Sequence, residues 1–212
     1  MKKLWIGIAR LFGWQYDIEG YDQRPELRHC VMIEAPHTSI YDFLLGASCI
    51  WKMGLNARFF IKKEFFVFPL RHILRWCGAI PVDRGNHSNH LVDKAVDTLQ
   101  KNPDFTIIIT PEGTRKRVKR FKRGFYEIAT RAGVPIVITY IDYRTRHMGI
   151  GPTIVPTGNY PADMQRILAA YEGVTARNPE GWDLPALKQS MIPTLPHSGD
   201  NEATAAHNTE KK

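Results

Sequence analysis

The sequence predicts an α/β fold, with a mostly parallel central sheet flanked by helices in a single domain, preceded by a short amphipathic N-terminal helix. Short apolar runs alternate with helical patterns through the middle of the chain, which is typical of parallel sheets. The length of 212 residues and a hydrophobic content of 43% suit one sizeable core. We therefore divide the chain into an N-terminal segment (1–20), an α/β domain (21–177) and a C-terminal extension (178–212) that we expect to be partly disordered.

The N-terminal segment predicts a basic amphipathic helix over residues 2–14. Its apolar residues share one face and cations accompany them: Leu4, Ile8, Leu11 and Phe12, with Lys2, Lys3 and Arg10. Such a helix fits a membrane interface, and packing on the domain is an equal alternative. No run reaches the roughly 18 apolar residues that cross a bilayer. Arg10 interrupts the apolar stretch and no small-residue cleavage site follows it, which argues against a signal peptide.

The remaining elements follow from periodicity and from glycine and proline positions. An edge strand can form at 15–20, and the alternation of short apolar runs predicts strands at 31–35, 57–61, 78–84, 105–110 and 134–141. Helices are predicted from residue 40 to Gly54, within 65–77 around Pro69, at 89–101 and at 125–132. A hairpin or irregular strand fits 147–155. A last helix follows, with Met164, Ile167, Leu168, Tyr171 and Val174 on one face.

The net charge of +8 indicates an anionic partner such as nucleic acid, a phospholipid surface or a phosphorylated substrate. Seven of the nine residues in 115–123 are cationic. Such a run is usually a solvated face or a nucleic-acid patch, and an anionic lipid surface fits it equally well. Phe121 is the only aromatic residue among these cations, whereas a nucleic-acid binder should interleave aromatic residues on a known motif. We therefore expect no nucleic-acid partner.

Three cysteines, Cys30, Cys49 and Cys77, have no metal-binding or redox spacing. Their odd number and scattered positions favour buried free thiols in a reducing compartment.

Three chemical groups lie just past predicted strands, namely His37, Arg84 and Glu112. Carboxyl ends of parallel strands meet at one edge of a sheet, where ligands bind. A neutral His with a pKa near 6.5 can accept a proton from a hydroxyl, and Asp42 could hold its imidazole. Alone, such a pair is more often structural. Similarly, the turn Pro111 to Arg115 can bind a phosphate or can be a surface turn with a salt bridge.

Taken together, four ordered motifs resemble the glycerolipid acyltransferase family, of the lysophosphatidic acid or glycerol-3-phosphate acyltransferase type. The motifs are His37 with Asp42, the segment 80–84 ending in Val-Asp-Arg, Pro-Glu-Gly-Thr-Arg at 111–115, and Val-Pro-Ile within 133–137. Residues 121–125 also look like the lysine-glycine segment of that family. The resemblance covers about residues 30–157. Pro36 departs from the pattern, because the family commonly has Asn before the His.

The resemblance implies transfer of an acyl group from acyl-CoA or acyl carrier protein to the hydroxyl of a lyso-glycerolipid. With 1-acyl-glycerol-3-phosphate as acceptor the product is phosphatidic acid, a step of phospholipid biosynthesis. His37 would deprotonate the hydroxyl and Asp42 would hold His37. The acceptor phosphate would contact Arg84, Arg115 and Lys122, in a pocket shaped by Glu112, Gly113 and Thr114. The scheme requires no metal, no cofactor and no covalent enzyme intermediate.

Two other hypotheses stay open. The same chemistry could act on glycerol-3-phosphate, another lysophospholipid or a lyso-aminolipid. Alternatively, a non-enzymatic basic module could bind anionic lipid or nucleic acid through residues 115–123. For the enzyme we expect a peripheral or monotopic protein on the cytoplasmic face of an anionic membrane surface. Contact would come from residues 2–14, the basic run and aromatic residues such as Phe65, Phe66 and Phe68.

Overall fold

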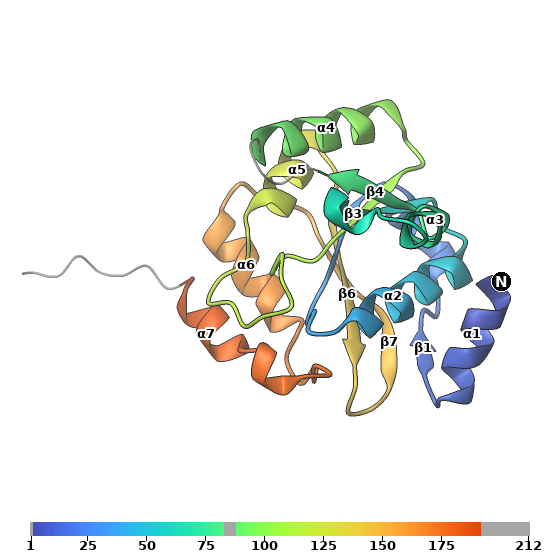
Figure 1. Cartoon of the computed structure of the whole chain (residues 1–212). Helices are drawn as coiled ribbons and strands as arrows, with labels where there is room; N and C mark the ends of the chain where they lie inside the picture. Colours follow the sequence, from blue (N-terminus) through green and yellow to red (C-terminus); the bar gives the residue numbers. More distant parts are fainter. Residues whose placement is uncertain (1, 83–87, 192–212) are drawn as a thin grey trace, which may run out of the picture.

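A computed structural model of the chain describes residues 2–82 and 88–191. Within these residues seven strands form one sheet in the order β1-β7-β6-β2-β5-β3-β4, with helices on both faces (Figure 1). The predicted fold class, a single α/β domain with a mostly parallel sheet, is confirmed.

The strands match the apolar runs of the sequence closely. Their bounds are β1 Gln15–Asp17, β2 Val31–Glu34, β3 Ala57–Lys62, β4 Ala79–Val82, β5 Thr106–Ile109, β6 Ile136–Asp142 and β7 His147–Ile154. β2 lies at the centre and pairs in parallel with β5 and β6. β7 follows β6 through a four-residue turn and is antiparallel to it, and β1 pairs in parallel with β7 at the edge. The interval 147–155 therefore forms the second half of a hairpin.

Helices cover both faces of the sheet. Their bounds are α1 Lys2–Leu11, α2 Ile40–Met53, α3 Leu70–Trp76, α4 Ser88–Lys101, α5 Gly124–Ala132, α6 Tyr160–Ala169 and α7 Leu184–Gln189. One core lies between the sheet and α4, α5, α6 and α7, and a second lies between the sheet and α1 and α2. α3 joins the second side where Trp76 meets Trp51 of α2, with ring centroids 4.8 Å apart.

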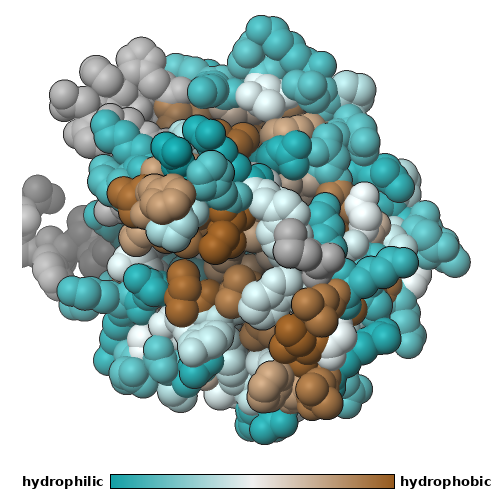
Figure 2. Space-filling model, turned by 45° about the vertical axis from the view of Figure 1, so that its right-hand side comes forward, coloured by the Kyte–Doolittle hydropathy of each residue, from teal (hydrophilic) through white to brown (hydrophobic). Residues whose placement is uncertain are grey.

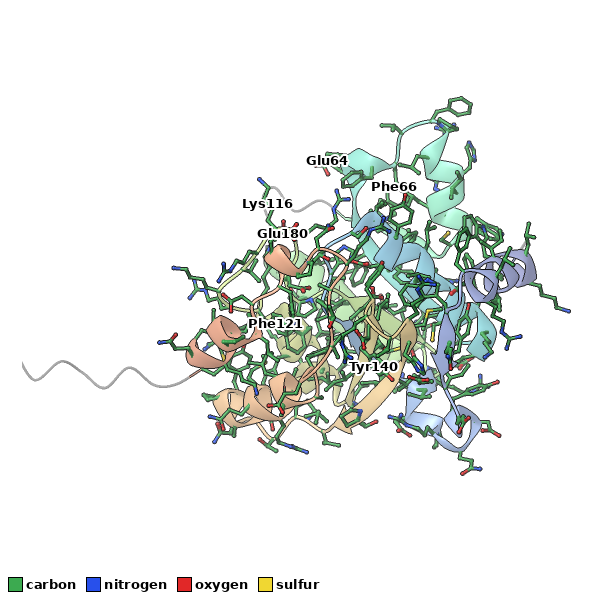
Figure 3. The ribbon with its side chains drawn as sticks, turned by 90° about the horizontal axis from the view of Figure 1, so that it is seen from below. Glu64, Phe66, Lys116, Phe121, Tyr140 and Glu180 are labelled. Carbon is green, nitrogen blue, oxygen red and sulfur yellow. The ribbon has the colours of Figure 1, made fainter. Side chains whose placement is uncertain are left out.

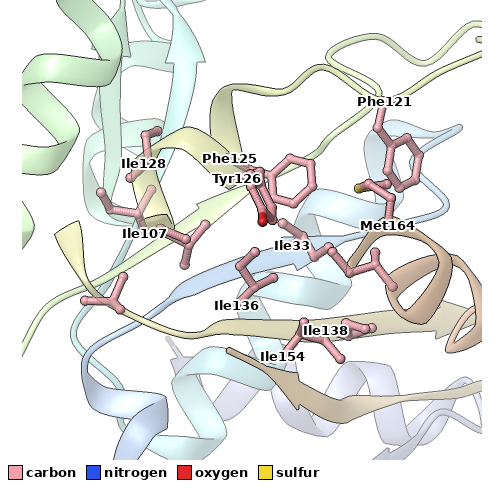
Figure 4. Close-up of a cluster of buried hydrophobic side chains, with 14 of the residues drawn as sticks. Ile33, Ile107, Phe121, Phe125, Tyr126, Ile128, Ile136, Ile138, Ile154 and Met164 are labelled. Carbon is pink, nitrogen blue, oxygen red and sulfur yellow. The ribbon is translucent and has the colours of Figure 1, made fainter. Parts of the chain in front are cut away.

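Successive side chains of β2 enter the two cores in turn. Val31 and Ile33 face the first core and Met32 faces the second, because successive side chains of a strand point to opposite faces. Figure 4 shows the first core, where Ile33, Ile107 and Ile136 from neighbouring strands meet Phe125 of α5. Since both faces are buried, the central strands β2 and β5 consist mainly of apolar residues. Cys30, Cys49 and Cys77 are buried free thiols, as predicted.

The last predicted helix begins earlier than its apolar pattern suggested. The Asn159 side chain accepts a hydrogen bond from Ala162 N and caps α6, and Pro161 suits the first turn. α6 ends at Ala169, so Tyr171 and Val174 lie in the turns after it. Residues 178–191 pack on the domain, and Leu187 of α7 belongs to the first core. Residues 192–212 lie outside the described part of the chain.

Candidate active site

The carboxyl edge of the parallel strands gathers the candidate residues. His37 follows β2, Glu112 follows β5 and Tyr143 follows β6. In Figure 1, β6 points toward this edge, and Figure 3 views the molecule from that side, with Tyr140 labelled near the end of β6. Arg84, which the sequence placed after β4, lies outside the described residues.

Asp42 is positioned by the start of α2. The Ser39 side chain accepts a hydrogen bond from Tyr41 N and caps the helix. The side chain of Asp42, at the third helical position, in turn accepts a hydrogen bond from the backbone N of Ser39. Asp42 Oδ2 accepts hydrogen bonds from Ser39 N at 2.7 Å and Thr38 N at 2.8 Å. Asp42 is fully buried, so this capping box fixes a carboxylate inside the protein.

His37 faces this carboxylate from the loop before α2. Its Nδ1 lies 3.4 Å from Asp42 Oδ2, and its side chain is 18% exposed. The pair is therefore close but loose, and Nδ1 makes no hydrogen bond to any described residue. Because Nδ1 faces Asp42, Nε2 is the nitrogen left for a substrate proton. Burial disfavours the charged imidazole, but the carboxyl groups of Asp42, Glu34 and Glu112 outweigh it, so the pKa of His37 is raised.

Glu112 also contacts His37, through its backbone. Glu112 Oε1 accepts a hydrogen bond from His37 N at 2.9 Å, and the side chain is buried. Burial raises the pKa of Glu112 to about 7. The sequence predicts Glu112 at a phosphate pocket, and the structure adds that its carboxyl group ties the turn after β5 to the loop that carries His37.

A third buried acid, Glu34, ends β2 beneath α2. Its Oε1 has no hydrogen-bond partner among the described residues. Its Oε2 lies so near the backbone of α2 that a Cβ on Gly46 would be 2.4 Å away. Burial raises the pKa of Glu34 to about 8. Three carboxyl groups, those of Glu34, Asp42 and Glu112, thus influence one imidazole.

The turn after β5 holds Gly113 against Lys122. Gly113 has φ 65°, a left-handed conformation, and a Cβ there would lie 2.8 Å from Lys122 Cε. Lys122 N donates to Pro111 O at 2.9 Å. The Lys122 cation therefore lies over the Pro-Glu-Gly-Thr-Arg turn. Thr114 accepts a hydrogen bond from Lys116 N at 3.3 Å, and Arg115 is exposed on the same turn.

A strap of residues 175–182 crosses the site, which the sequence did not reveal. Asn178 N donates to Thr38 Oγ1, and Asn178 Nδ2 donates to Thr38 O. Gly181 lies so close that a Cβ would meet Thr38 Cγ2 at 3.0 Å and Arg115 O at 3.4 Å. The strap therefore fastens the His37 loop to the turn after β5.

The structure brings together His37, Asp42, Glu112, Gly113 and Lys122, and adds Glu34 and Tyr143. Both additions had a signal in the sequence. Glu34 is an acid inside an apolar run, and Tyr143 follows the predicted strand 134–141 at the edge where the other groups lie. The strap had no such signal, because nothing in its composition indicates what it contacts.

A His/Asp pair with a buried carboxylate lies at the carboxyl edge of the parallel strands, beside a Pro-Glu-Gly-Thr-Arg turn. Comparison with known families assigns this arrangement to a class of enzyme. The family model described as Acyltransferase matches residues 15–142, which is more than half of the chain. The chain belongs to this family.

Three curated proteins similar to this chain are all described as 1-acyl-sn-glycerol-3-phosphate acyltransferases. The chain is 27% identical over 166 residues to the chloroplastic 1-acyl-sn-glycerol-3-phosphate acyltransferase BAT2 of Brassica napus, covering 74% of this chain and 44% of that protein. LPAT1 of Arabidopsis thaliana, with the same description, is also 27% identical over 166 residues, covering 74% and 42%. The 1-acyl-sn-glycerol-3-phosphate acyltransferase of Salmonella typhimurium is 29% identical over 135 residues, covering 61% and 54%. The chain thus spans about half the length of these relatives.

Proposed function

We propose that this protein transfers a fatty acyl group from an acyl thioester to the free hydroxyl of 1-acyl-glycerol-3-phosphate, giving phosphatidic acid. The observation that carries the proposal is the His37–Asp42 pair at the carboxyl edge of the sheet, in a chain whose relatives share this description. The acyl donor is acyl-CoA or acyl carrier protein.

The reaction needs one base and one reprotonation. His37 Nε2 takes the proton of the acceptor hydroxyl while the hydroxyl oxygen attacks the thioester carbonyl carbon. The C–O bond forms and a tetrahedral oxyanion results. Its collapse breaks the C–S bond, and the leaving thiolate takes the proton back from the imidazolium. Asp42 stabilises the imidazolium, since its Oδ2 faces Nδ1 at 3.4 Å.

The acceptor phosphate would lie beside the turn after β5. Lys122 lies over Gly113, next to the residue that holds His37 N, so a phosphate bound there leaves the acceptor near Nε2. Arg115 is exposed on the same turn and can supply a bidentate contact. In the part of the chain that the structure describes, no acidic group forms an ion pair with Lys122 or Arg115.

We also propose that the catalytic edge faces an anionic membrane surface. α1 packs on α2 through its buried Ala9, yet leaves Leu11 and Phe12 exposed by 84% and 65%. They precede β1, whose first residue pairs with His147 at the start of β7, so they lie at the catalytic edge. Phe65 and Phe68 follow the carboxyl end of β3 at the same edge, and Phe68 is 76% exposed.

Hydrophobic side chains gather on the side of the molecule that carries α1 and α3 (Figure 2). Among the described helices none is both long and hydrophobic enough to span a bilayer. Exposed aromatic residues and cations of the 115–123 run together suit adsorption to anionic lipid, which would present the lyso-lipid to His37. Lys116 illustrates the run, since it projects outward in Figure 3.

The test is an acyl-transfer assay with purified protein. Acyl-CoA or acyl carrier protein loaded with an acyl chain is mixed with 1-acyl-glycerol-3-phosphate, glycerol-3-phosphate or other lyso-lipids, and thiol release and lipid product are followed. We expect product with 1-acyl-glycerol-3-phosphate and a loss of about 10³-fold or more in His37→Ala. The matched control is His147→Ala, because His147 also pairs with a carboxylate, Asp17, at 2.9 Å but lies on β7.

The outcomes separate the hypotheses. Transfer to a different acceptor keeps the chemistry and corrects the substrate. Absence of transfer to every acceptor, or equal loss in His37→Ala and His147→Ala, would overturn the proposal and favour a basic binding module.

A further inference from the structure

The Asp42 carboxylate has two oxygens with different partners. Oδ2 accepts hydrogen bonds from Thr38 N and Ser39 N, and it faces His37. Oδ1 accepts one hydrogen bond, from Tyr143 Oη at 2.6 Å. Tyr143 stands at the end of β6, about 100 residues further along the chain than Asp42. A side chain from a neighbouring strand end thus completes the shell of the carboxylate that holds the base.

Contacts from two other segments, the residues before β1 and the strap, hold Tyr143 in place. Trp14, between α1 and β1, meets it edge-on with ring centroids 5.0 Å apart. The Arg177 guanidinium of the strap lies 6.0 Å from its centroid. The backbone N of Tyr143 donates a hydrogen bond to Thr175 O, also in the strap, at 2.9 Å. These contacts restrict rotation of the Tyr143 side chain, so its hydroxyl stays directed at Asp42.

Asp42 needs this partner because it is fully buried. A buried carboxylate oxygen without a donor carries its full desolvation cost. The two backbone N–H groups hold Oδ2, so loss of the phenol would let the carboxylate pivot about Oδ2 and change the angle it offers to His37. Burial and the Asp42 carboxylate both raise the pKa of Tyr143 far above the range of any assay, so the phenol remains a donor throughout.

We propose that Tyr143 is a positioning residue of the catalytic pair: its hydroxyl orients Asp42 and spreads the carboxylate charge, and so sets the orientation and basicity of His37. The inference rests on the proposed function, since it concerns the same His/Asp pair. It extends the site from two residues to a chain of three, His37, Asp42 and Tyr143.

Tyr143→Phe removes only the hydroxyl. We expect kcat to fall about tenfold, which corresponds to one misaligned hydrogen bond, with KM for donor and acceptor within about twofold. The acid limb of the kcat/KM profile should move to higher pH, because the Asp42 charge then concentrates on the oxygen that faces His37. A 3-fluorotyrosine at position 143, a stronger donor of nearly the same shape, should move the limb the opposite way and covers the case in which Tyr143→Phe folds poorly.

Tyr140→Phe is the matched control. Tyr140 lies three residues earlier, and its hydroxyl donates to Asp17 Oδ2 at the same 2.6 Å, away from His37. Both variants lose one tyrosine–aspartate hydrogen bond, and both should unfold at a lower temperature than the wild type. Only Tyr143→Phe should change kcat and the acid limb. In an Asp42→Ala background it should have no further effect on kcat.

The two proposals fail in different ways. If the wild type transfers no acyl group, the proposed function is wrong. If the wild type is active and Tyr143→Phe matches Tyr140→Phe in kcat and in its pH profile, Tyr143 is a structural residue and the inference is wrong.

Discussion

Replacing Glu34 with Gln should change how the stability of the protein depends on pH. Glu34 ends β2 with a fully buried carboxyl group, and burial raises its pKa from 4.5 to about 8. The folded protein therefore holds a proton that the unfolded chain releases. Stability from this group is complete below the unfolded pKa and is lost as pH rises through the folded pKa. Gln carries no proton to lose, so Glu34→Gln should lack this loss.

The size of the effect follows from the gap between the two pKa values. Each pH unit within the gap is worth about 1.4 kcal/mol. Between pH 5 and pH 9 the wild type should therefore lose about 4 kcal/mol more than Glu34→Gln. That is a large part of the roughly 5–15 kcal/mol that stabilises a typical domain. At pH 5 the free energy of unfolding of Glu34→Gln can differ from that of the wild type, because the amide packs differently from the carboxyl group. This difference does not depend on pH, so only the change of stability with pH tests the pKa of Glu34.

Urea unfolding of the wild type and of Glu34→Gln at intervals from pH 5 to pH 9 measures this difference in stability directly. The control is Glu64→Gln, since Glu64 is exposed in the segment before α3 (Figure 3), and its curve should run parallel to that of the wild type. If the curves of the wild type and Glu34→Gln are also parallel, Glu34 is ionised at neutral pH in the folded protein, and our account of the buried acids is wrong.

Two further changes test the helix cap and the phosphate contact. Ser39→Ala removes the side-chain cap of α2 and should cost about 1 kcal/mol of unfolding free energy, measured by urea unfolding; an unchanged midpoint would mean that the buried Asp42 carboxylate alone holds the helix start. Lys122→Ala should raise KM for a phosphorylated acceptor about tenfold with KM for the donor unchanged. Lys116→Ala, which removes a cation that projects outward, is its control, and equal effects would place the phosphate elsewhere.

Most of the fold could be predicted because its signals are local. Apolar runs gave the parallel strands, and Gly54 and Gly133 end α2 and α5 in the left-handed conformation that favours glycine. The end of α6 could not be placed, because Tyr171 is fully buried and continues the apolar pattern from a turn. Helical periodicity reports which side chains are buried, and a turn beside the core buries them as well.

The candidate site was predicted only in part, for a similar reason. His37, Asp42 and Glu112 stand in short motifs whose spacing is visible along the chain. Which atoms they contact is decided by elements far away in sequence. The sequence placed Glu112 at the phosphate pocket but did not show that its carboxyl group accepts a hydrogen bond from His37 N, over a separation of 75 residues. Tyr143 reaches Asp42 over 101 residues. Such pairings depend on sheet order, which the strand pattern alone does not give.

The placement of charge within the site resolves an apparent conflict in a protein that should bind phosphate. Three carboxyl groups around His37 would repel an anionic acceptor if all were ionised. Burial raises the pKa of Glu34 to about 8 and that of Glu112 to about 7, so Glu34 is mainly neutral at pH 7 and Glu112 is partly neutral. Lys122 lies over Gly113 outside these acids, where a phosphate can reach it. The Asp42 carboxylate, which faces Nδ1, can therefore raise the pKa of His37, while protonation of the other two acids weakens their repulsion of the anion.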